Sequence, residues 1–423
     1  MSVGSGQVKQ AKPKKKFSRG KVAALGVALG LALSLSFTAC SLVKSKMQPR
    51  QQESTISETT TPTPQEQLSP PEDLDTQVSR IVGEMTVEEK VAQLFFVTPE
   101  SLTGMGQVIA AGETTKKAYN TMPVGGIIYF ELNLNDTEQT QTMLSATQEY
   151  ATERTGIPVF LAVDEEGGTV TRVGGHSGFT AKDPGNMRAI GDTGDTNQAR
   201  ETARTIGTYL ADLGFNVDFA PVADIANSSS TTMSKRSFGS TSQAVSPMVA
   251  AQIEGFSEAG VLCSAKHFPG IGGAYGDSHT GAISSSKTIE QMKTEELQPF
   301  YTAIDAGVPF IMVGHLTVQQ ATGSQLPASL NPVMMSELLR EDMGYEGLII
   351  TDSLGMGAVT QFYNPNEVGL QAVLAGADMI LMPTNLQASY ETVLAAVRDG
   401  RLSEERLDES VHRIVRTKVE MKQ

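Results

Sequence analysis

Short apolar segments alternate with amphipathic segments along most of this chain, and the alternation limits the folds that it can adopt. Eight short segments are apolar on both faces, as the strands of a parallel sheet covered by helices are. They are residues 93–97, 126–130, 159–164, 217–224, 261–267, 310–315, 348–352 and 379–382. Eight such units predict an α/β fold, a TIM-like (β/α)8 barrel in a single domain. A doubly wound open sheet produces the same alternation and is the alternative.

The segments between these strands carry helical patterns. One apolar stripe with spacings of three and four residues is formed by Ala199, Ala203, Ile206, Leu210 and Leu213. Residues 290–306 and 404–421 have similar patterns. Such stripes are typical of helices that pack one face against a sheet.

The first 39 residues have the pattern of an export signal. Seven Lys and Arg residues and no acidic residue lie in this segment, and residues 22–39 are uncharged and rich in Leu, Ala and Gly. Cys40 follows, and residues 37–40 (FTAC) resemble a bacterial lipobox, in which the cysteine is lipidated. We therefore expect a lipoprotein signal peptide over residues 1–39 and a lipid anchor on Cys40 in the cytoplasmic membrane, with the protein outside the cytoplasm. An uncleaved anchor and plain secretion are the alternatives.

Residues 40–77 differ in composition from the rest of the chain. They are rich in Gln, Glu, Ser, Thr and Pro and contain few apolar residues, so they cannot bury enough surface to offset the entropy of ordering. We expect a disordered stalk here and a folded domain over residues 78–423.

The charge and cysteine content exclude two classes of protein. The net charge is −14, and the basic excess is confined to the export signal, so the folded part lacks the basic surface that a nucleic-acid partner requires. The chain has two Cys residues, which excludes a disulfide-rich scaffold.

Ionisable residues follow several of the predicted strands at their carboxyl ends. These residues are Asp164, Asp224, His267, His315 and Asp352. In a barrel of parallel strands all these ends open onto one face, where active sites are built. The repetition predicts a functional site on that face, although any one of these residues alone is more often a helix cap or a buried polar group.

Three segments carry a resemblance to a known family. They are residues 164–172 (DEEGGTVTR), residues 266–279 (KHFPGIGGAYGDSH) and residues 350–356 (ITDSLGM). They resemble the family 3 glycoside hydrolases, in particular the β-N-acetylglucosaminidase branch, and supporting stretches extend the resemblance over about residues 81–418. The chain departs from the family pattern at Thr169, where Arg is frequent, and at Ile271, where His is usual. These departures concern substrate contacts more than the chemistry.

The resemblance implies retaining glycoside hydrolysis with Asp352 as the nucleophile. In place of a second carboxylate, it implies His279 as the acid and base, oriented by Asp277. The residue types suit these roles, because a carboxylate attacks the anomeric carbon and an imidazole paired with a carboxylate can donate and later accept a proton.

The same resemblance implies a set of residues that hydrogen-bond the hydroxyl groups of a terminal N-acetylglucosamine. They are Asp164, Arg172, Arg236, Lys266 and His267. Charged donors and acceptors discriminate hydroxyl positions well, because a missing partner leaves a buried charge unpaired. Glu165 and Glu166 are further candidates for minor acid roles, and His315 is a candidate for the lining of the site.

The sequence therefore predicts an exo-acting retaining β-N-acetylglucosaminidase that acts on peptidoglycan fragments or related glycans and needs no cofactor. No metal site is expected, since the His residues are scattered and Cys263 lies inside an apolar strand. A dinucleotide site is disfavoured, because Tyr275 occupies the third glycine position of the motif. A phosphorylase of the same glycosides and a tethered solute-binding lipoprotein are the alternatives.

Overall fold

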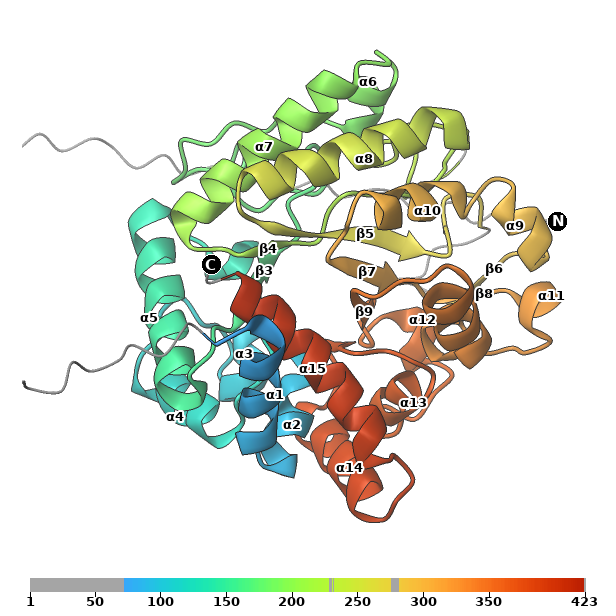
Figure 1. Cartoon of the computed structure of the whole chain (residues 1–423). Coiled ribbons are helices and arrows are strands. Elements are labelled where there is room, and N and C mark those ends of the chain that lie inside the picture. Colours follow the sequence, from blue (N-terminus) through green and yellow to red (C-terminus); the bar gives the residue numbers. More distant parts are fainter. Residues whose placement is uncertain (1–71, 228–229, 231, 275–280, 422–423) are drawn as a thin grey trace, which may run out of the picture. The chain divides into compact units, whose positions relative to one another are not determined.

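A closed barrel of eight parallel strands forms the centre of the protein (Figure 1). The computed structural model describes residues 72–227, 230, 232–274 and 281–421. The strands are β1 (Phe95–Val97), β2 (Gly126–Ile128), β3 (Phe160–Val163), β4 (Val217–Asp218), β5 (Leu262–Phe268), β7 (Phe310–Val313), β9 (Leu348–Thr351) and β10 (Ile380–Leu381). Seven parallel pairings run from β10 through β1 to β9, and a bridge between Ile350 and Met379 completes the ring. The predicted TIM-like barrel is thus confirmed, and the open sheet is excluded.

Helices surround the barrel and connect its strands. They are α1 (Leu74–Glu84), α2 (Val87–Gln93), α3 (Pro99–Thr103), α4 (Glu113–Thr121), α5 (Thr137–Thr155), α6 (Met187–Gly191), α7 (Thr196–Leu213), α8 (Ser242–Glu258), α9 (Ile289–Lys293), α10 (Gln298–Asp305), α11 (Gln319–Thr322), the π-helix η3 (Val333–Asp342), α12 (Gly357–Thr360), α13 (Val368–Leu374), α14 (Leu386–Arg398) and α15 (Glu404–Glu420). None of the described helices is long and apolar enough to cross a membrane. The predicted signal and Cys40 lie outside the described residues.

The pair α7 and α8 shows how the sequence pattern becomes packing. The predicted stripe from Ala199 to Leu213 is buried along α7, and α8 lies beside this helix (Figure 1). The approach is close, because a Cβ atom on Gly255 would lie 2.2 Å from the carbonyl oxygen of Arg200. Gly255 therefore sets the distance between the two helices.

Three details differ from the sequence-based expectations. The predicted helix over 290–306 is two helices, α9 and α10, because Pro299 is accommodated in the first turn of a helix and not in its interior. The short strands β6 (Ile283–Ser284) and β8 (Leu316–Thr317) form a second parallel sheet that was not predicted. Helix α1 starts at Leu74, within the segment that was expected to be stalk.

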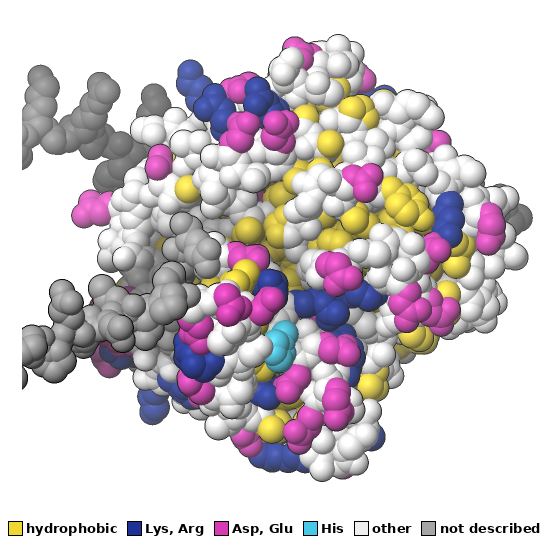
Figure 2. All heavy atoms as spheres, viewed as in Figure 1, with side chains coloured by type: hydrophobic (Ala, Val, Ile, Leu, Met, Phe, Trp, Pro, Cys, Tyr) yellow, Lys and Arg dark blue, Asp and Glu magenta, His cyan; other side chains and the backbone are white. Residues whose placement is uncertain are grey.

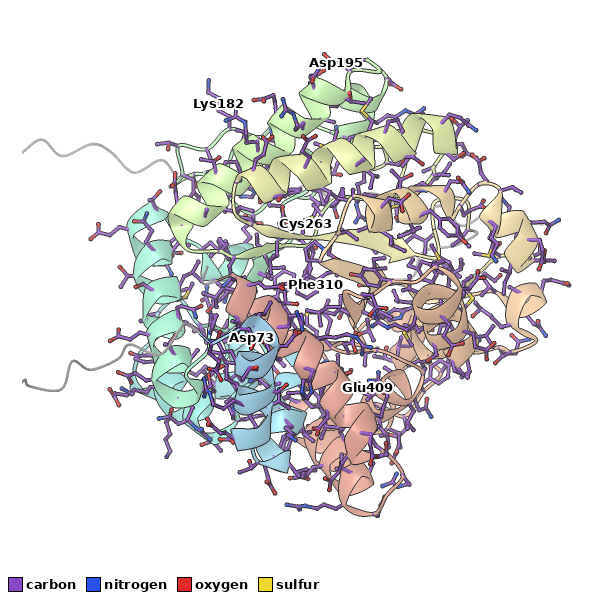
Figure 3. The ribbon with its side chains drawn as sticks, viewed as in Figure 1. Asp73, Lys182, Asp195, Cys263, Phe310 and Glu409 are labelled. Atoms are coloured by element: carbon purple, nitrogen blue, oxygen red, sulfur yellow. The ribbon has the colours of Figure 1, made fainter. Side chains whose placement is uncertain are left out.

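The early start of α1 has a local cause. The side chain of Asp73 caps the helix by accepting a hydrogen bond from the backbone N–H of Thr76, at 3.0 Å. Val78 and Val82 are buried, and α1 lies against α15 (Figure 1). The first turn of α1, residues 74–77, has one apolar residue. For this reason its composition suggested that it belongs to the stalk. Figure 3 marks Asp73 at the beginning of this helix.

Aromatic side chains fill much of the barrel interior. The ring of Phe160 lies 5.2 Å from that of Phe310 and 6.3 Å from that of Phe96, centre to centre. Figure 3 shows Phe310 and Cys263 among the strands. Gly126 leaves room for this packing, since a Cβ atom there would lie 2.4 Å from the Phe96 ring. The interior is therefore a packed core, as in other barrels of this type.

One lysine of α15 enters this core. Lys418 is fully buried, its ammonium group donates to Oε1 of Gln93 at 2.7 Å, and it lies 5.0 Å from the centre of the Phe160 ring. Burial lowers the pKa of Lys418 from 10.5 to about 7, because an apolar environment disfavours the charged form. The charge of Lys418 is therefore a source of instability in neutral and acidic solution.

We predict that Lys418→Met stabilises the protein at pH 7 by on the order of 1 kcal/mol or more. Between about pH 7 and pH 10.5 the unfolded chain binds the extra proton, so the wild type gains stability as the pH rises through this range. The advantage of the variant should shrink over the same range. Denaturant unfolding at several pH values measures this, with the exposed Lys182 replaced by Met as the control. A constant difference between the variant and the wild type would contradict the prediction.

Candidate functional site

The carboxyl ends of the strands surround a cavity of about 340 Å³. Six of the predicted site residues line it: Asp164, Arg172, Arg236, Lys266, His267 and Asp352. They come from segments up to about 190 residues apart in the chain, and only barrel closure brings them together. The predicted pair Asp277 and His279 lies outside the described residues.

A buried ion network forms one side of this cavity. The ammonium group of Lys266 lies 2.7 Å from Oδ1 of Asp164 and 2.7 Å from Oε1 of Glu166. The guanidinium group of Arg236 binds the same Glu166 through two nitrogens, at 2.6 and 2.7 Å. Lys266 and Glu166 are each only 2% exposed. The network therefore holds both cations in fixed positions at the cavity wall.

Glu166 is the residue that joins the two cations. Burial alone would raise the pKa of its carboxyl group, but the charges of Lys266 and Arg236 outweigh this effect and hold the pKa far below its usual value. Both of its oxygens already accept hydrogen bonds. Glu166 is thus an ionised anchor, and the expectation of an acid role for it is wrong.

Glu165 also has a structural role. Its carboxylate accepts hydrogen bonds from the backbone N–H groups of Val173 and Gly174, at 3.1 and 2.7 Å, and from the hydroxyl group of Tyr209, at 2.8 Å. It is fully buried and does not line the cavity. Glu165 therefore shapes the loop that carries Arg172, and the expectation of an acid role is wrong for this residue too.

His267 is oriented by Asp224. The Nδ1 atom of His267 lies 2.7 Å from Oδ2 of Asp224, and Oδ1 of the same carboxylate accepts the backbone N–H of Ile271 at 2.6 Å. A carboxylate at this position favours a proton on Nδ1, which fixes the tautomer and the ring orientation. Asp224 therefore supports the site through His267.

The position of Asp224 differs from the sequence-based expectation. The predicted strand over 217–224 ends at Asp218, so Asp224 does not close a strand. Pro221 has no backbone N–H and interrupts the ladder, and Asp224 reaches the site through the loop that follows. No local pattern in the sequence identified Asp224 as the partner of His267. An acidic residue at the end of a largely apolar stretch was, however, a sign that this side chain has a buried partner.

Asp352 follows β9 at the rim of the barrel. Its backbone N–H donates to the carbonyl oxygen of Val313 at 2.8 Å, and its Oδ1 accepts the backbone N–H of Ser353 at 2.7 Å. The N-cap position of the next helix, α12, is occupied by Met356, so Asp352 is not a helix cap. Burial would raise the pKa of Asp352, but the charges of His267 and His315 together with other nearby groups lower it. Asp352 is therefore ionised, as a carboxylate nucleophile must be.

His315 supports the loop after Asp352. Its Nε2 atom lies 2.8 Å from the carbonyl oxygen of Ser353, and its Nδ1 atom lies 2.7 Å from the hydroxyl oxygen of Ser329. The side chain is buried and is not part of the cavity lining. The sequence predicted His315 in the lining of the site, and this expectation is wrong. The side chain lies behind the lining and holds the loop after Asp352 in place.

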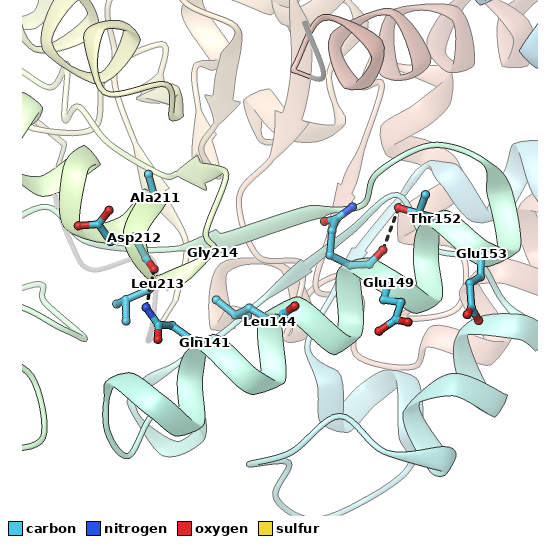
Figure 4. A pocket seen from close by; sticks show the side chains of 11 residues that line it. Gln141, Leu144, Glu149, Thr152, Glu153, Ala211, Asp212, Leu213 and Gly214 are labelled. Carbon is cyan, nitrogen blue, oxygen red and sulfur yellow. Dashed lines mark hydrogen bonds between the residues drawn. The ribbon is translucent and has the colours of Figure 1, made fainter. Parts of the chain in front are cut away.

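Three larger hollows lie elsewhere and contain none of the predicted site residues, and two of them are much larger than the cavity. One, of about 770 Å³, lies between α5 and the end of α7 (Figure 4). The other, of about 650 Å³, lies at the amino-terminal end of the barrel, and Figure 2 shows hydrophobic side chains gathered there beside Lys and Arg. Among the described residues no group of three His, Cys, Asp or Glu side chains is arranged to hold a metal ion. Chemistry is thus best sought at the smaller cavity, where the ionisable groups meet.

The fold and this cavity agree with what is known of one enzyme family. The model for the "Glycosyl hydrolase family 3 N terminal domain" matches residues 86–417, and the chain belongs to glycoside hydrolase family 3. The resemblance in the three sequence segments is thus confirmed.

Individual relatives give a finer comparison. The beta-hexosaminidase A of Pseudoalteromonas piscicida is 33% identical over 328 residues, which cover 71% of this chain and 54% of that protein. The beta-hexosaminidase LpqI of Mycobacterium tuberculosis is 35% identical over 271 residues, covering 62% and 68%. A solved glycoside hydrolase family 3 beta-N-acetylglucosaminidase from Paenibacillus sp. str. FPU-7 superposes with a TM-score of 0.74 at 36% identity, covering 80% and 64%. The chain spans only about half the length of the first of these relatives.

The ion network yields a prediction about stability. Glu166→Gln leaves Lys266 and Arg236 without their shared counter-charge, and we expect the free energy of unfolding at pH 7 to fall by roughly 3–5 kcal/mol. Because the pKa of Glu166 is lowered from 4.5, its contribution is complete above that pH, decreases as the pH falls below 4.5, and is lost once the pH has fallen through the folded-state pKa. Urea unfolding at pH 7 and pH 3 measures both effects, with the exposed Glu149→Gln as the control. A loss below 1 kcal/mol at pH 7 would count against the network.

Proposed function

We propose that this protein is an exo-acting retaining β-N-acetylglucosaminidase that removes terminal N-acetylglucosamine from glycans. The observation that carries the proposal is Asp352, an ionised carboxylate at a strand end that faces a cavity lined by charged hydrogen-bonding groups. The relatives named beta-hexosaminidase and the beta-N-acetylglucosaminidase structure support the same reaction class.

In the proposed reaction Asp352 attacks the anomeric carbon and displaces the leaving oxygen, which forms a glycosyl-enzyme ester. Water then hydrolyses the ester, so the sugar leaves with its original configuration. The carboxylate is suited to attack because its pKa is lowered and its backbone is held by Val313. Little reorganisation is needed at the nucleophile.

Other polar groups of the cavity lining are suited to hold the sugar. Lys266 and Asp164 present a donor and an acceptor that are already paired with each other, and a sugar hydroxyl can bridge them. His267 is held by Asp224 and offers its second nitrogen. Since each of these groups is buried or partly buried, a sugar that lacks the matching hydroxyl would leave a charge poorly solvated.

The acid and base roles are assigned to His279 with Asp277, on the sequence alone. The imidazolium donates a proton to the leaving oxygen in the first step, and the neutral imidazole activates water in the second. The source of the substrate is proposed to be peptidoglycan fragments. Phosphorolysis of the same glycosides is the competing outcome.

One assay tests the reaction class, the sugar and the acceptor together. The protein is incubated with an aryl β-N-acetylglucosaminide and with the matching aryl β-glucoside, each with and without phosphate. Faster release from the first substrate and free N-acetylglucosamine as the product support the proposal. A sugar 1-phosphate would identify a phosphorylase, and tight binding of the sugar without turnover would identify a binding protein.

Asp352→Asn should leave the fold intact, because the two side chains have nearly the same size and shape. It should lower the rate on the aryl β-N-acetylglucosaminide by roughly a thousandfold or more, since an amide cannot form the ester. The control is Asp212→Asn, at an exposed position on the hollow of Figure 4. Near-normal turnover by folded Asp352→Asn would refute the assignment.

His279→Ala should slow the hydrolysis of a disaccharide much more than that of a nitrophenyl glycoside, because a nitrophenolate leaves without a proton. Azide should restore part of the rate on the nitrophenyl substrate, since an anionic nucleophile needs no base. Asp277→Ala should show the same behaviour more weakly. Equal slowing of both substrates with no effect of azide would remove His279 from the acid and base role.

A further inference from the structure

The described part of the cavity lining offers little aromatic surface to the apolar face of a sugar. Protein sites that hold rings commonly offer an aromatic face. The chain contains no Trp, and among the described residues Phe130 is the one aromatic residue in the cavity lining. The guanidinium group of Arg172 lies 5.7 Å from the centre of the Phe130 ring. That ring face is therefore already in contact with a cation.

Methionines make up much of the remaining apolar lining. Met233, Met312, Met356 and Met382 all line the cavity. Met233 and Met312 are only 2% and 3% exposed, so they offer little surface to a ligand. Met356 and Met382 are partly exposed and remain available for contact.

Backbone hydrogen bonds connect both of these methionines to the turn that follows Asp352. Met356 lies four residues after Asp352, and its backbone N–H donates to the carbonyl oxygen of Ser353 at 3.1 Å. The N–H of Leu354 donates to the carbonyl oxygen of Leu381 at 3.0 Å, directly before Met382. The turn after Asp352 and the end of β10 are thus held together with a methionine on each.

The backbone of Met382 is in an unfavourable conformation. Its φ angle is 48°, the one positive φ among the described non-glycine residues. Met has no local side-chain hydrogen bond to favour that region, and Pro383 follows it, which restricts the backbone further. The N–H of Met382 donates to the carbonyl oxygen of Phe96 at 2.8 Å, which holds the residue there. Strain of this kind persists where the surrounding structure imposes it, and it concentrates at functional sites.

We infer that Met356 and Met382 form a thioether platform on which the C–H face of the terminal sugar lies, in place of an aromatic ring. This inference rests on the proposed function. Methionine is suited to the task because its unbranched, polarisable side chain adapts to an irregular apolar surface. The platform lies next to Asp352, so it would set the height of the sugar ring relative to the attacking carboxylate.

Two substitutions at Met382 separate the platform from the strain. Met382→Ala removes the side chain and keeps a Cβ atom, whereas Met382→Gly removes the side chain and relieves the strain at φ 48°. On the aryl β-N-acetylglucosaminide we expect both variants to raise KM about tenfold with a smaller change in kcat, as loss of uniform binding does. The glycine variant should have the higher Tm of the two. Met356→Ala should also raise KM, and Met105→Ala, at a residue that is 48% exposed, should change neither constant.

A second measurement does not depend on turnover. Hydrogen peroxide oxidises accessible methionines to sulfoxides, and saturating N-acetylglucosamine should protect Met356 and Met382 but not Met105, as followed by peptide mass spectrometry. An unchanged KM in folded Met382→Ala, or binding of the sugar without protection, would overturn the platform while the proposed function stands. A wild type that neither turns over the glycoside nor binds the sugar would overturn both.

Discussion

A buried carboxylate at the start of β10 is the interaction on which the closed barrel depends. Asp378 is fully buried, and its Oδ2 accepts the backbone N–H of Ile349 in β9 at 3.0 Å and binds Arg340 at 2.7 Å. Its Oδ1 accepts the hydroxyl group of Ser410 at 2.7 Å and pairs with Arg413 at 3.2 Å. One side chain therefore joins the last two strands to η3 and α15. Charge-assisted bonds of this kind are strong when every partner is present.

The contact between β9 and β10 needs such support because it is short. Beyond the bridge between Ile350 and Met379, the backbone N–H of Leu381 donates to the side-chain oxygen of Thr351 at 3.0 Å in place of a regular ladder bond. The candidate nucleophile Asp352 and the strained Met382 lie directly beyond this contact, on its two sides. The geometry of the cavity therefore depends on the contact between β9 and β10. Asp378 stabilises this contact from the amino-terminal end of the two strands, whereas the cavity lies at their carboxyl-terminal end.

The sequence predicted the parts of this arrangement that are local. All eight barrel strands were located, because a strand buried on both faces is an uninterrupted apolar run, and most of the charged residues at their ends followed from the same pattern. Long-range pairing was not visible. Arg236 was expected to bind the sugar, but nothing in the sequence indicated its pairing with Glu166, which only the fold brings about.

The boundaries of elements were predicted less well, for a different reason. Asp224 was assigned to a strand because the run from 217 to 224 is largely apolar, yet Pro221 interrupts the regular ladder, and only a single bridge, Val222 to Lys266, follows it. The first turn of α1 was assigned to the stalk because its stability comes from a cap and from contacts with α15 rather than from its own composition. In both cases the deciding interaction involves backbone groups, which composition does not report.

The charges that line the cavity also affect how strongly it attracts a ligand that is still approaching from solution. Three carboxylates, of Asp164, Glu166 and Asp352, and three cations, of Arg172, Arg236 and Lys266, line it. Apart from the imidazole of His267, which also lines the cavity, these six charges sum to zero, so they exert little net attraction on an approaching ion. A neutral sugar can enter without a counter-ion and without competing with dissolved salt, and its rate of association should depend little on ionic strength.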